Sequence, residues 1–175
     1  MDTASAVAVD AADDIFVVGG FYGTANFGGA GPLTATSGSD VYIVKYTLAG
    51  AYLWARSFGG TGSEVATAAA VNGLGDVVIV GTFCGTISFG GPPMSSTSAC
   101  SFTDAFAARL TTPDGSYVNS VRAGGTGSEV GSGVSLSSDG RFYVTGDFNG
   151  FAEFGGHALT PLGIADSYIL GLAPL

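Results

Sequence analysis

The chain has 175 residues, enough for one domain with a sizeable core, and 46% of them are hydrophobic. Only 11% are charged, against about 25% in an average domain, and the net charge is −9. Five scattered Lys and Arg residues argue against nucleic-acid partners and anionic membrane surfaces. No apolar run is long enough for a membrane-spanning helix, and the first ten residues lack the pattern of a signal peptide.

Strand-type segments begin at once and follow a fixed order. Runs rich in Val, Ile, Phe and Tyr occupy 6–21, 40–47 and 50–58, with Gly, Asn, Asp and Ser between them. A Phe-x-Gly…Phe-Gly-Gly motif, FYGTANFGG, lies at 21–29 and precedes a variable stretch at 30–39. This composition predicts short β-strands joined by tight turns.

The same order returns twice. The second copy has strand-type runs and the motif at 68–83, 83–91, 104–111 and 115–123, and the third at 133–148, 148–156 and 166–173. Both later copies follow the heptapeptide GGTGSEV, which therefore marks the passage from one unit to the next. The predicted units are 2–58, 59–123 and 124–175, and the third lacks its fourth strand.

The repeat length indicates the architecture. Phe27, Phe89 and Phe154 recur 62 and 65 residues apart, which is typical of β-propeller blades with four antiparallel strands. We therefore predict an all-β chain of about three such blades, with these phenylalanines between them and hairpin turns at NGLGD and SSDGR. A parallel β-solenoid is the alternative fold.

The segments AVAVD, IFVVGGF and LWARSFGGTGSE resemble the bacterial β-propeller repeats called SBBP, and the resemblance covers essentially the whole chain. It implies a secreted or cell-surface bacterial protein with a scaffold or binding role, and it carries over no catalytic residue. The cysteine-bearing insert and the long variable stretches depart from the family pattern. Propellers usually close with four to eight blades, so a longer chain or a second copy is expected to complete the ring.

Few residues point to catalysis. GGTGSEV lacks the third glycine of a dinucleotide-binding loop and the Gly-Lys-Ser/Thr of a P-loop, and a strand follows it. The single histidine, His157, lies in a turn of one copy, and no Gly-x-Ser-x-Gly elbow occurs. No catalytic residue is predicted, although glycoside hydrolysis by paired carboxylates is an alternative.

Several acids recur with the repeat and leave Ca²⁺ as the one cofactor to consider. The candidate ligands are Asp40, Asp104, Asp166, Glu64 and Glu129. We favour the alternative that these acids accept backbone N–H bonds at turns. Cys84 and Cys100 flank an insert that only one unit has, and we favour a disulfide between them over two unrelated small apolar residues. Such a bond implies an oxidising compartment.

The variable stretches 30–39, 92–103 and 157–165 fall at the same place in every unit, so they are expected to project from one face as binding loops. The sequence thus predicts a non-enzymatic extracellular or cell-surface module that binds a protein or another ligand. The alternative is a glycan-binding lectin in which Tyr22, Trp54 and Tyr117 stack on sugars. Those aromatic residues are also suited to packing between blades.

Overall fold

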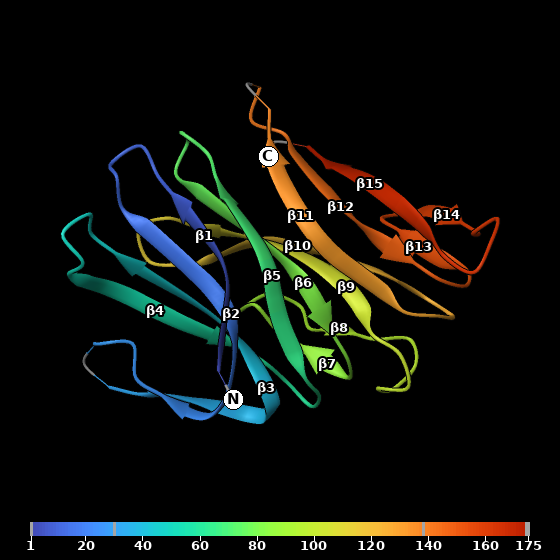
Figure 1. Ribbon diagram of the computed structural model, residues 1–175, viewed down its shortest axis with the longest axis horizontal. Helices are drawn as coiled ribbons and strands as arrows, with labels where there is room; N and C mark the ends of the chain where they lie inside the picture. The colour runs from blue at the N-terminus through green and yellow to red at the C-terminus, as the bar shows by residue number, and fades with distance from the viewer. Residues whose placement is uncertain (1, 30, 138, 174–175) are drawn as a thin grey trace.

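The computed structural model describes residues 2–29, 31–137 and 139–173 of the chain. These residues form fifteen strands and no helix, and every pairing between strands is antiparallel (Figure 1). The all-β prediction is therefore confirmed, and the antiparallel pairing rules out the parallel solenoid. No segment in the described ranges is a helix that could cross a membrane.

The first sheet follows the chain in simple up-and-down order. Its strands are β1 (Thr3–Val9), β2 (Ile15–Ala25), β3 (Leu33–Tyr46) and β4 (Tyr52–Phe58). The pairing of β2 with β3 continues past a register shift to Ala25 and Leu33, so β3 starts earlier than the predicted 40–47. Part of the variable stretch 30–39 is consequently strand rather than loop, and residue 30 lies outside the described residues.

The second and third sheets repeat this order. The main strands of the second are β5 (Glu64–Val71), β6 (Asp76–Phe83), β9 (Asp104–Thr111) and β10 (Tyr117–Gly125). The third sheet has β11 (Glu129–Leu136), β12 (Phe142–Phe148) and β15 (Asp166–Leu172). These strands, with those of the first sheet, are the ones that the sequence predicts. The free edge of β15 lies where the other two sheets have a fourth strand.

Two short hairpins were not expected from the sequence. One consists of β7 (Thr86–Ile87) and β8 (Met94–Ser95), and the other of β13 (Ala152–Phe154) and β14 (His157–Leu159). The hairpin of the third unit crosses to the second sheet, where β13 pairs with the end of β10. The hairpin of the second unit likewise touches the preceding linker through a bridge between Ile87 and Gly60. Each hairpin therefore ties its unit to the one before.

The first two strands of the first and second units are joined by tight turns whose side chains bond their own backbone, whereas the predicted turn SSDGR of the third unit contains residue 138, which lies outside the described residues. Asn72 Oδ1 accepts the N–H groups of Leu74 and Asp76, both at 2.9 Å, and Gly75 has a φ of +94°. Asp10 Oδ1 does the same for Ala12 and Asp14 in the first unit. The predicted turn at NGLGD is confirmed, and its conformation explains the glycine at this point.

The three sheets stack face to face, and their first strands β1, β5 and β11 lie side by side across the middle of the molecule (Figure 1). One core lies between the first and second sheets, where the ring of Phe89 is 5.1 Å from Phe58 and 4.9 Å from Phe106. The other lies between the second and third sheets and includes Phe154. Phe27 packs on Tyr42, 4.4 Å away, on the face of the first sheet that no other described sheet covers.

The glycines of the repeated heptapeptide are required by close backbone approaches at the two joints between sheets. A Cβ added at Gly59 would lie 2.1 Å from the carboxyl carbon of Asp40, and one at Gly60 would lie 1.4 Å from the carbonyl oxygen of Thr86. A Cβ at Gly62 would lie 2.0 Å from the carbonyl oxygen of Cys84. The second joint has the same contacts, from Gly124 to Asp104, Gly125 to Phe151 and Gly127 to Asn149.

Hydrogen bonds fix these approaches. Thr61 Oγ1 accepts the N–H of Thr86 at 3.1 Å, and Cys84 donates its N–H to the Ser63 carbonyl oxygen at 3.1 Å. Cys84 is also bonded to Cys100, with the sulfur atoms 2.03 Å apart. The disulfide therefore closes the insert next to the linker that joins the first two sheets.

We predict that Gly60→Ala destabilises the fold far more than Gly73→Ala. The new methyl group at 60 has no room beside Thr86, whereas no atom lies within 4 Å of a Cβ at 73. The expected loss for Gly60→Ala is about 2 kcal/mol or more of unfolding free energy, measured by urea denaturation. Equal losses in the two variants would contradict this account of the linker.

Candidate functional site

All three variable connections lie at one end of the stack. Because strand direction alternates within each sheet, the β2–β3, β6–β9 and β12–β15 connections share this end with the two linkers. The tight turns between first and second strands lie at the opposite end. In Figure 1 the connections run along the lower and right-hand border. The up-and-down order of the strands thus places the variable connections of all three units at the same end of the stack.

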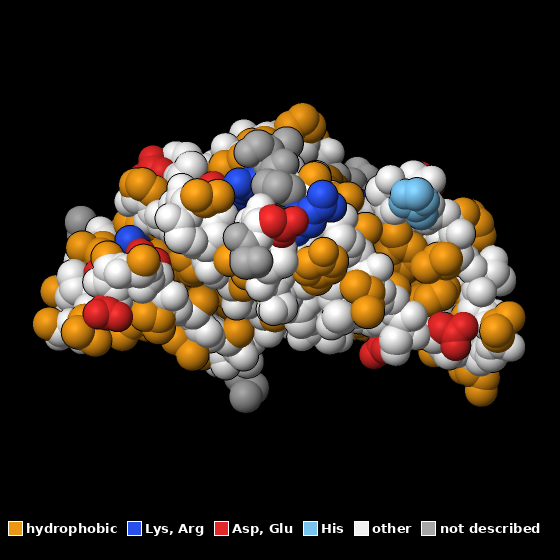
Figure 2. All heavy atoms as spheres, turned by 90° about the horizontal axis from the view of Figure 1, so that it is seen from above, with side chains coloured by type: hydrophobic (Ala, Val, Ile, Leu, Met, Phe, Trp, Pro, Cys, Tyr) orange, Lys and Arg blue, Asp and Glu red, His pale blue; other side chains and the backbone are white. Residues whose placement is uncertain are grey.

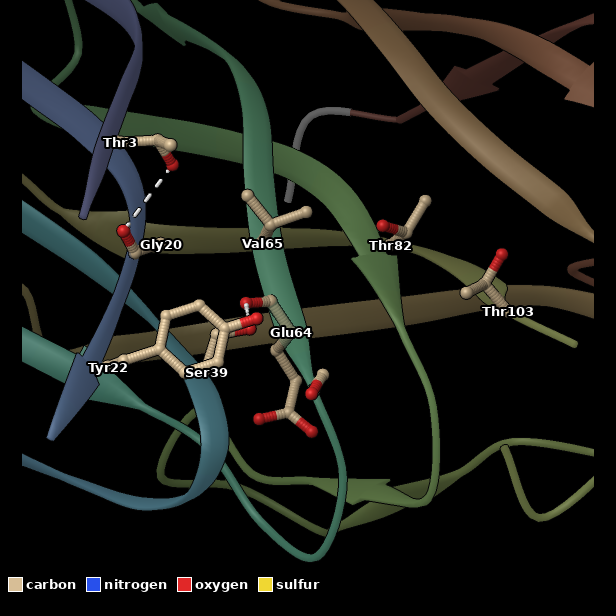
Figure 3. Close-up of a pocket in the computed structure, with 9 residues that line it drawn as sticks. Thr3, Gly20, Tyr22, Ser39, Glu64, Val65, Thr82 and Thr103 are labelled. Carbon is tan, nitrogen blue, oxygen red and sulfur yellow. Dashed lines mark hydrogen bonds between the residues drawn. The ribbon is translucent and has the colours of Figure 1, made fainter. Parts of the chain in front are cut away.

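A hollow of about 500 Å³ opens at this end between the first and second sheets. Its polar lining is made mostly of hydroxyl groups, with one tyrosine ring (Figure 3). The residues concerned are Thr3, Ser39, Ser63, Thr82, Thr103 and Tyr22. Tyr22 belongs to β2 of the first sheet, whereas Thr82 is the last residue but one of β6 in the second sheet. The stacking of the two sheets therefore creates this hollow.

The structure does not bring the three predicted aromatic residues together. Tyr22 is 51% exposed and lines the hollow. Trp54 is half-buried against Phe16, with ring centres 5.9 Å apart, and its Nε1 donates to the carbonyl oxygen of Thr112. Tyr117 is half-buried beside Gly91 and borders a different hollow, of about 340 Å³. Tyr22 lines the larger of the two hollows, and Tyr117 borders the other beside the hydroxyl groups of Ser57, Ser88 and Ser116.

The three recurring aspartates occupy equivalent places and make equivalent bonds. Oδ2 of Asp40 accepts the N–H of Thr36 at 3.0 Å, and Oδ2 of Asp104 accepts that of Thr97 at 3.2 Å. Asp166 Oδ2 accepts the N–H of Leu162 at 2.8 Å. These bonds are the turn-type contacts that the sequence analysis favoured, and they hold the ends of the variable connections against β3, β9 and β15.

The recurring glutamates behave differently from that expectation. Glu64 is 1% exposed and Glu129 is fully buried, and their carboxyl oxygens make no hydrogen bond in the described part of the chain. Burial and, after it, the nearby Asp40 carboxyl raise the pKa of Glu64 to about 8, although the backbone N–H groups of Gly60 and Gly62 act in the opposite direction. In the same way burial raises the pKa of Glu129 to about 7.

The two joints differ by one cation. At the second joint, Arg122 Nη1 donates to Asp104 Oδ2 at 2.9 Å and to Thr97 Oγ1 at 2.8 Å. The equivalent position at the first joint is Ser57, because Ser57 pairs with Tyr42 as Arg122 pairs with Phe106. The sequence analysis missed this difference. An alignment of the fourth strands, YLWARSF with YVNSVRA, would have shown it.

The candidate Ca²⁺ ligands do not form a cluster. Among the residues that the structure describes, no group of three or more His, Cys, Asp or Glu side chains is placed to hold a metal ion. Ca²⁺ takes six to eight oxygen ligands, whereas Asp40 and Asp104 each lie near a single glutamate. The described side chains therefore do not fit a Ca²⁺ site.

Comparisons with protein-family models and with curated proteins find no match for this chain. The resemblance to SBBP repeats stays a prediction that rests on the motifs.

We predict that the fold loses stability as the pH rises from about 5 to about 8. The folded-state pKa of Glu64 lies above its ordinary value of 4.5, so its stabilising effect is complete below 4.5 and is lost as the pH rises through about 8. Denaturant titrations across this range should show a loss on the order of 3 kcal/mol. Part of it should disappear in Glu64→Gln, and the remainder belongs to Glu129, whose pKa is raised to about 7.

Ser57→Arg provides a matched test, because it places at Asp40 the cation that Arg122 supplies at Asp104. This variant should flatten the pH dependence above pH 7, where the carboxyl group of Glu64 loses its proton. Glu153→Gln, at an exposed glutamate, is the control and should follow the parent chain. A parent chain whose stability rises between pH 5 and pH 8 would contradict the prediction.

Proposed function

We propose that the stacked sheets are blades of a β-propeller and that the chain is a non-enzymatic scaffold and binding module. Three features support the propeller. Each unit is an up-and-down sheet, the first strands of successive sheets are neighbours, and each joint repeats the same glycine contacts. The motifs that resemble SBBP repeats lie on these strands and linkers. A secreted or cell-surface location agrees with the disulfide between Cys84 and Cys100.

The outer face of the third sheet supports a ring with further blades. Ile169 is 75% exposed and Tyr143 is 41% exposed on this face. In the second sheet the positions equivalent to them in the repeat, Ala107 and Val78, are buried in the core shared with the third sheet. A following blade would cover Ile169 and Tyr143 in the same way. It would come from the rest of a longer chain or from a second copy.

The isolated chain of 175 residues is therefore expected to self-associate, as measured by light scattering over a range of concentrations. Ile169→Asp should weaken this association about tenfold or more, because it places a charge in the covered face. Leu48→Asp is the matched control, since Leu48 is 70% exposed at a turn. A folded parent chain that stays monomeric at all concentrations would contradict a ring completed by a second copy.

The binding role rests on one observation, the gathering of all three variable connections at one end of the stack. Large apolar side chains are exposed there and suit an interaction surface. They are Phe102, Phe151, Leu159, Leu162 and Ile164. Figure 2 shows the opposite end, which carries the tight turns, and hydrophobic side chains outnumber charged ones there too, in keeping with the low charge of the chain.

A printed array of glycans and extracellular-matrix proteins tests this role. We expect at least one probe to bind, and the combined substitutions Phe102→Ser, Leu162→Ser and Ile164→Ser to reduce its binding about tenfold. The control combines Leu48→Ser with Leu74→Ser, which are 70% and 74% exposed at the turn end. The absence of any binding, or equal loss in the control, would overturn the proposed role.

A further inference from the structure

We propose that the hollow beside Tyr22 is a binding site for an uncharged carbohydrate. This inference rests on the proposed binding role and assigns it a place and a ligand class. A hollow of about 500 Å³ is within the range of small-molecule sites and has room for a short saccharide. It lies between two sheets that are fixed by the first linker, so its walls are formed before any ligand arrives.

The tyrosine ring supplies an apolar surface on which a sugar ring can pack. Tyr22 is 51% exposed, although its neighbour Phe21 and its strand partner Ser39 are buried. Cys84 and Asn149 occupy the same position in the other two units, where Cys84 is in the disulfide and Asn149 Oδ1 accepts the N–H of Ser128. Only the first unit therefore presents an aromatic ring here. A rigid, amphipathic tyrosine gives contact area at low entropic cost.

The surrounding hydroxyl groups match the alternating donors and acceptors of a sugar. Thr3 Oγ1 donates to the carbonyl oxygen of Gly20, and Ser39 Oγ donates to that of Glu64 at 2.9 Å. A hydroxyl oxygen that has donated its hydrogen still accepts from a ligand hydroxyl. Thr82 and Thr103 come from the second sheet and lie on the other side of Val65 from Tyr22 (Figure 3). Hydroxyl groups thus stand near Tyr22 and, across Val65, in the second unit.

The charges around the hollow select an uncharged ligand. No Lys or Arg lines it. Every Lys and Arg side chain is paired with aspartate in the described part of the chain, Lys45 with Asp10 and Asp14, and Arg56, Arg109, Arg122 and Arg141 with one aspartate each. A phosphate, sulfate or carboxylate would therefore find no counter-ion here.

The only carboxyl group among the lining residues belongs to Glu64. It points away from Thr82 toward the linker, as Figure 3 shows. Asp2 also lies beside Tyr22, where its Oδ1 accepts the N–H of Tyr22 at 3.1 Å, and its carboxyl group disfavours an anionic ligand.

Saturation-transfer NMR with the methyl glycosides of glucose, galactose, mannose and N-acetylglucosamine tests the inference, followed by titration of the best ligand. We expect at least one glycoside to bind, and Tyr22→Ala to weaken it about tenfold or more. Tyr22→Phe should retain most of the affinity, because the ring remains. Leu74→Ala removes an exposed apolar side chain at the turn end of the stack and should leave glycoside binding unchanged.

Three results would overturn the inference: no glycoside binds, Tyr22→Ala binds as well as the parent chain, or sialic acid binds more tightly than every neutral glycoside. Failure here is distinguishable from failure of the proposed function. If the array detects ligands that depend on Phe102, Leu162 and Ile164 while the glycosides do not bind, the binding role stands and the sugar site does not.

Discussion

The arrangement of the three sheets depends on how closely the linker backbone approaches its neighbours. Gly60 and Gly125 leave no space for a side chain beside the carbonyl oxygens of Thr86 and Phe151. Such contacts set the distance between one unit and the next within narrow limits, because backbone atoms cannot move aside as flexible side chains can. The cores around Phe89 and Phe154 then fill the space that the linkers define. The heptapeptide recurs in the sequence because the same close backbone contact recurs at each joint between sheets.

The fold could be predicted largely from the sequence because its signals are local and occur three times. The apolar runs, the turn at NGLGD and the glycine-rich linkers each have a direct physical reason in the structure. The short hairpins could not be predicted in this way. In β13, Ala152 and Phe154 are stabilised by the edge of β10, which belongs to another unit, and three residues alone give no strand signal.

The candidate site was less predictable, because it depends on which side chains different sheets bring together. Tyr22, Trp54 and Tyr117 look alike as exposed aromatic candidates in the sequence, yet only the stacking decides that Trp54 packs on Phe16 while Tyr22 remains open. The hydroxyl residues Thr82 and Thr103 carry no sequence signal at all. The role of the recurring acids was predictable for the aspartates, whose turns are local. It was not predictable for Glu64, whose environment comes from two units.

The position of Tyr22 shows how a repeat can keep its frame and still vary its chemistry. At this position the backbone N–H donates a hydrogen bond in all three units. Cys84 and Asn149 donate to the carbonyl oxygens of Ser63 and Ser128, and Tyr22 donates to the side-chain Oδ1 of Asp2. Because the backbone carries the structural bond, the side chain is free to differ. One unit uses it for a disulfide, one for an amide bond to the linker, and one leaves an aromatic ring in the open. Main-chain contacts hold the units together. The linker glycines recur because these contacts leave no room for a side chain, and the residue at the position of Tyr22 varies because only its backbone N–H is needed.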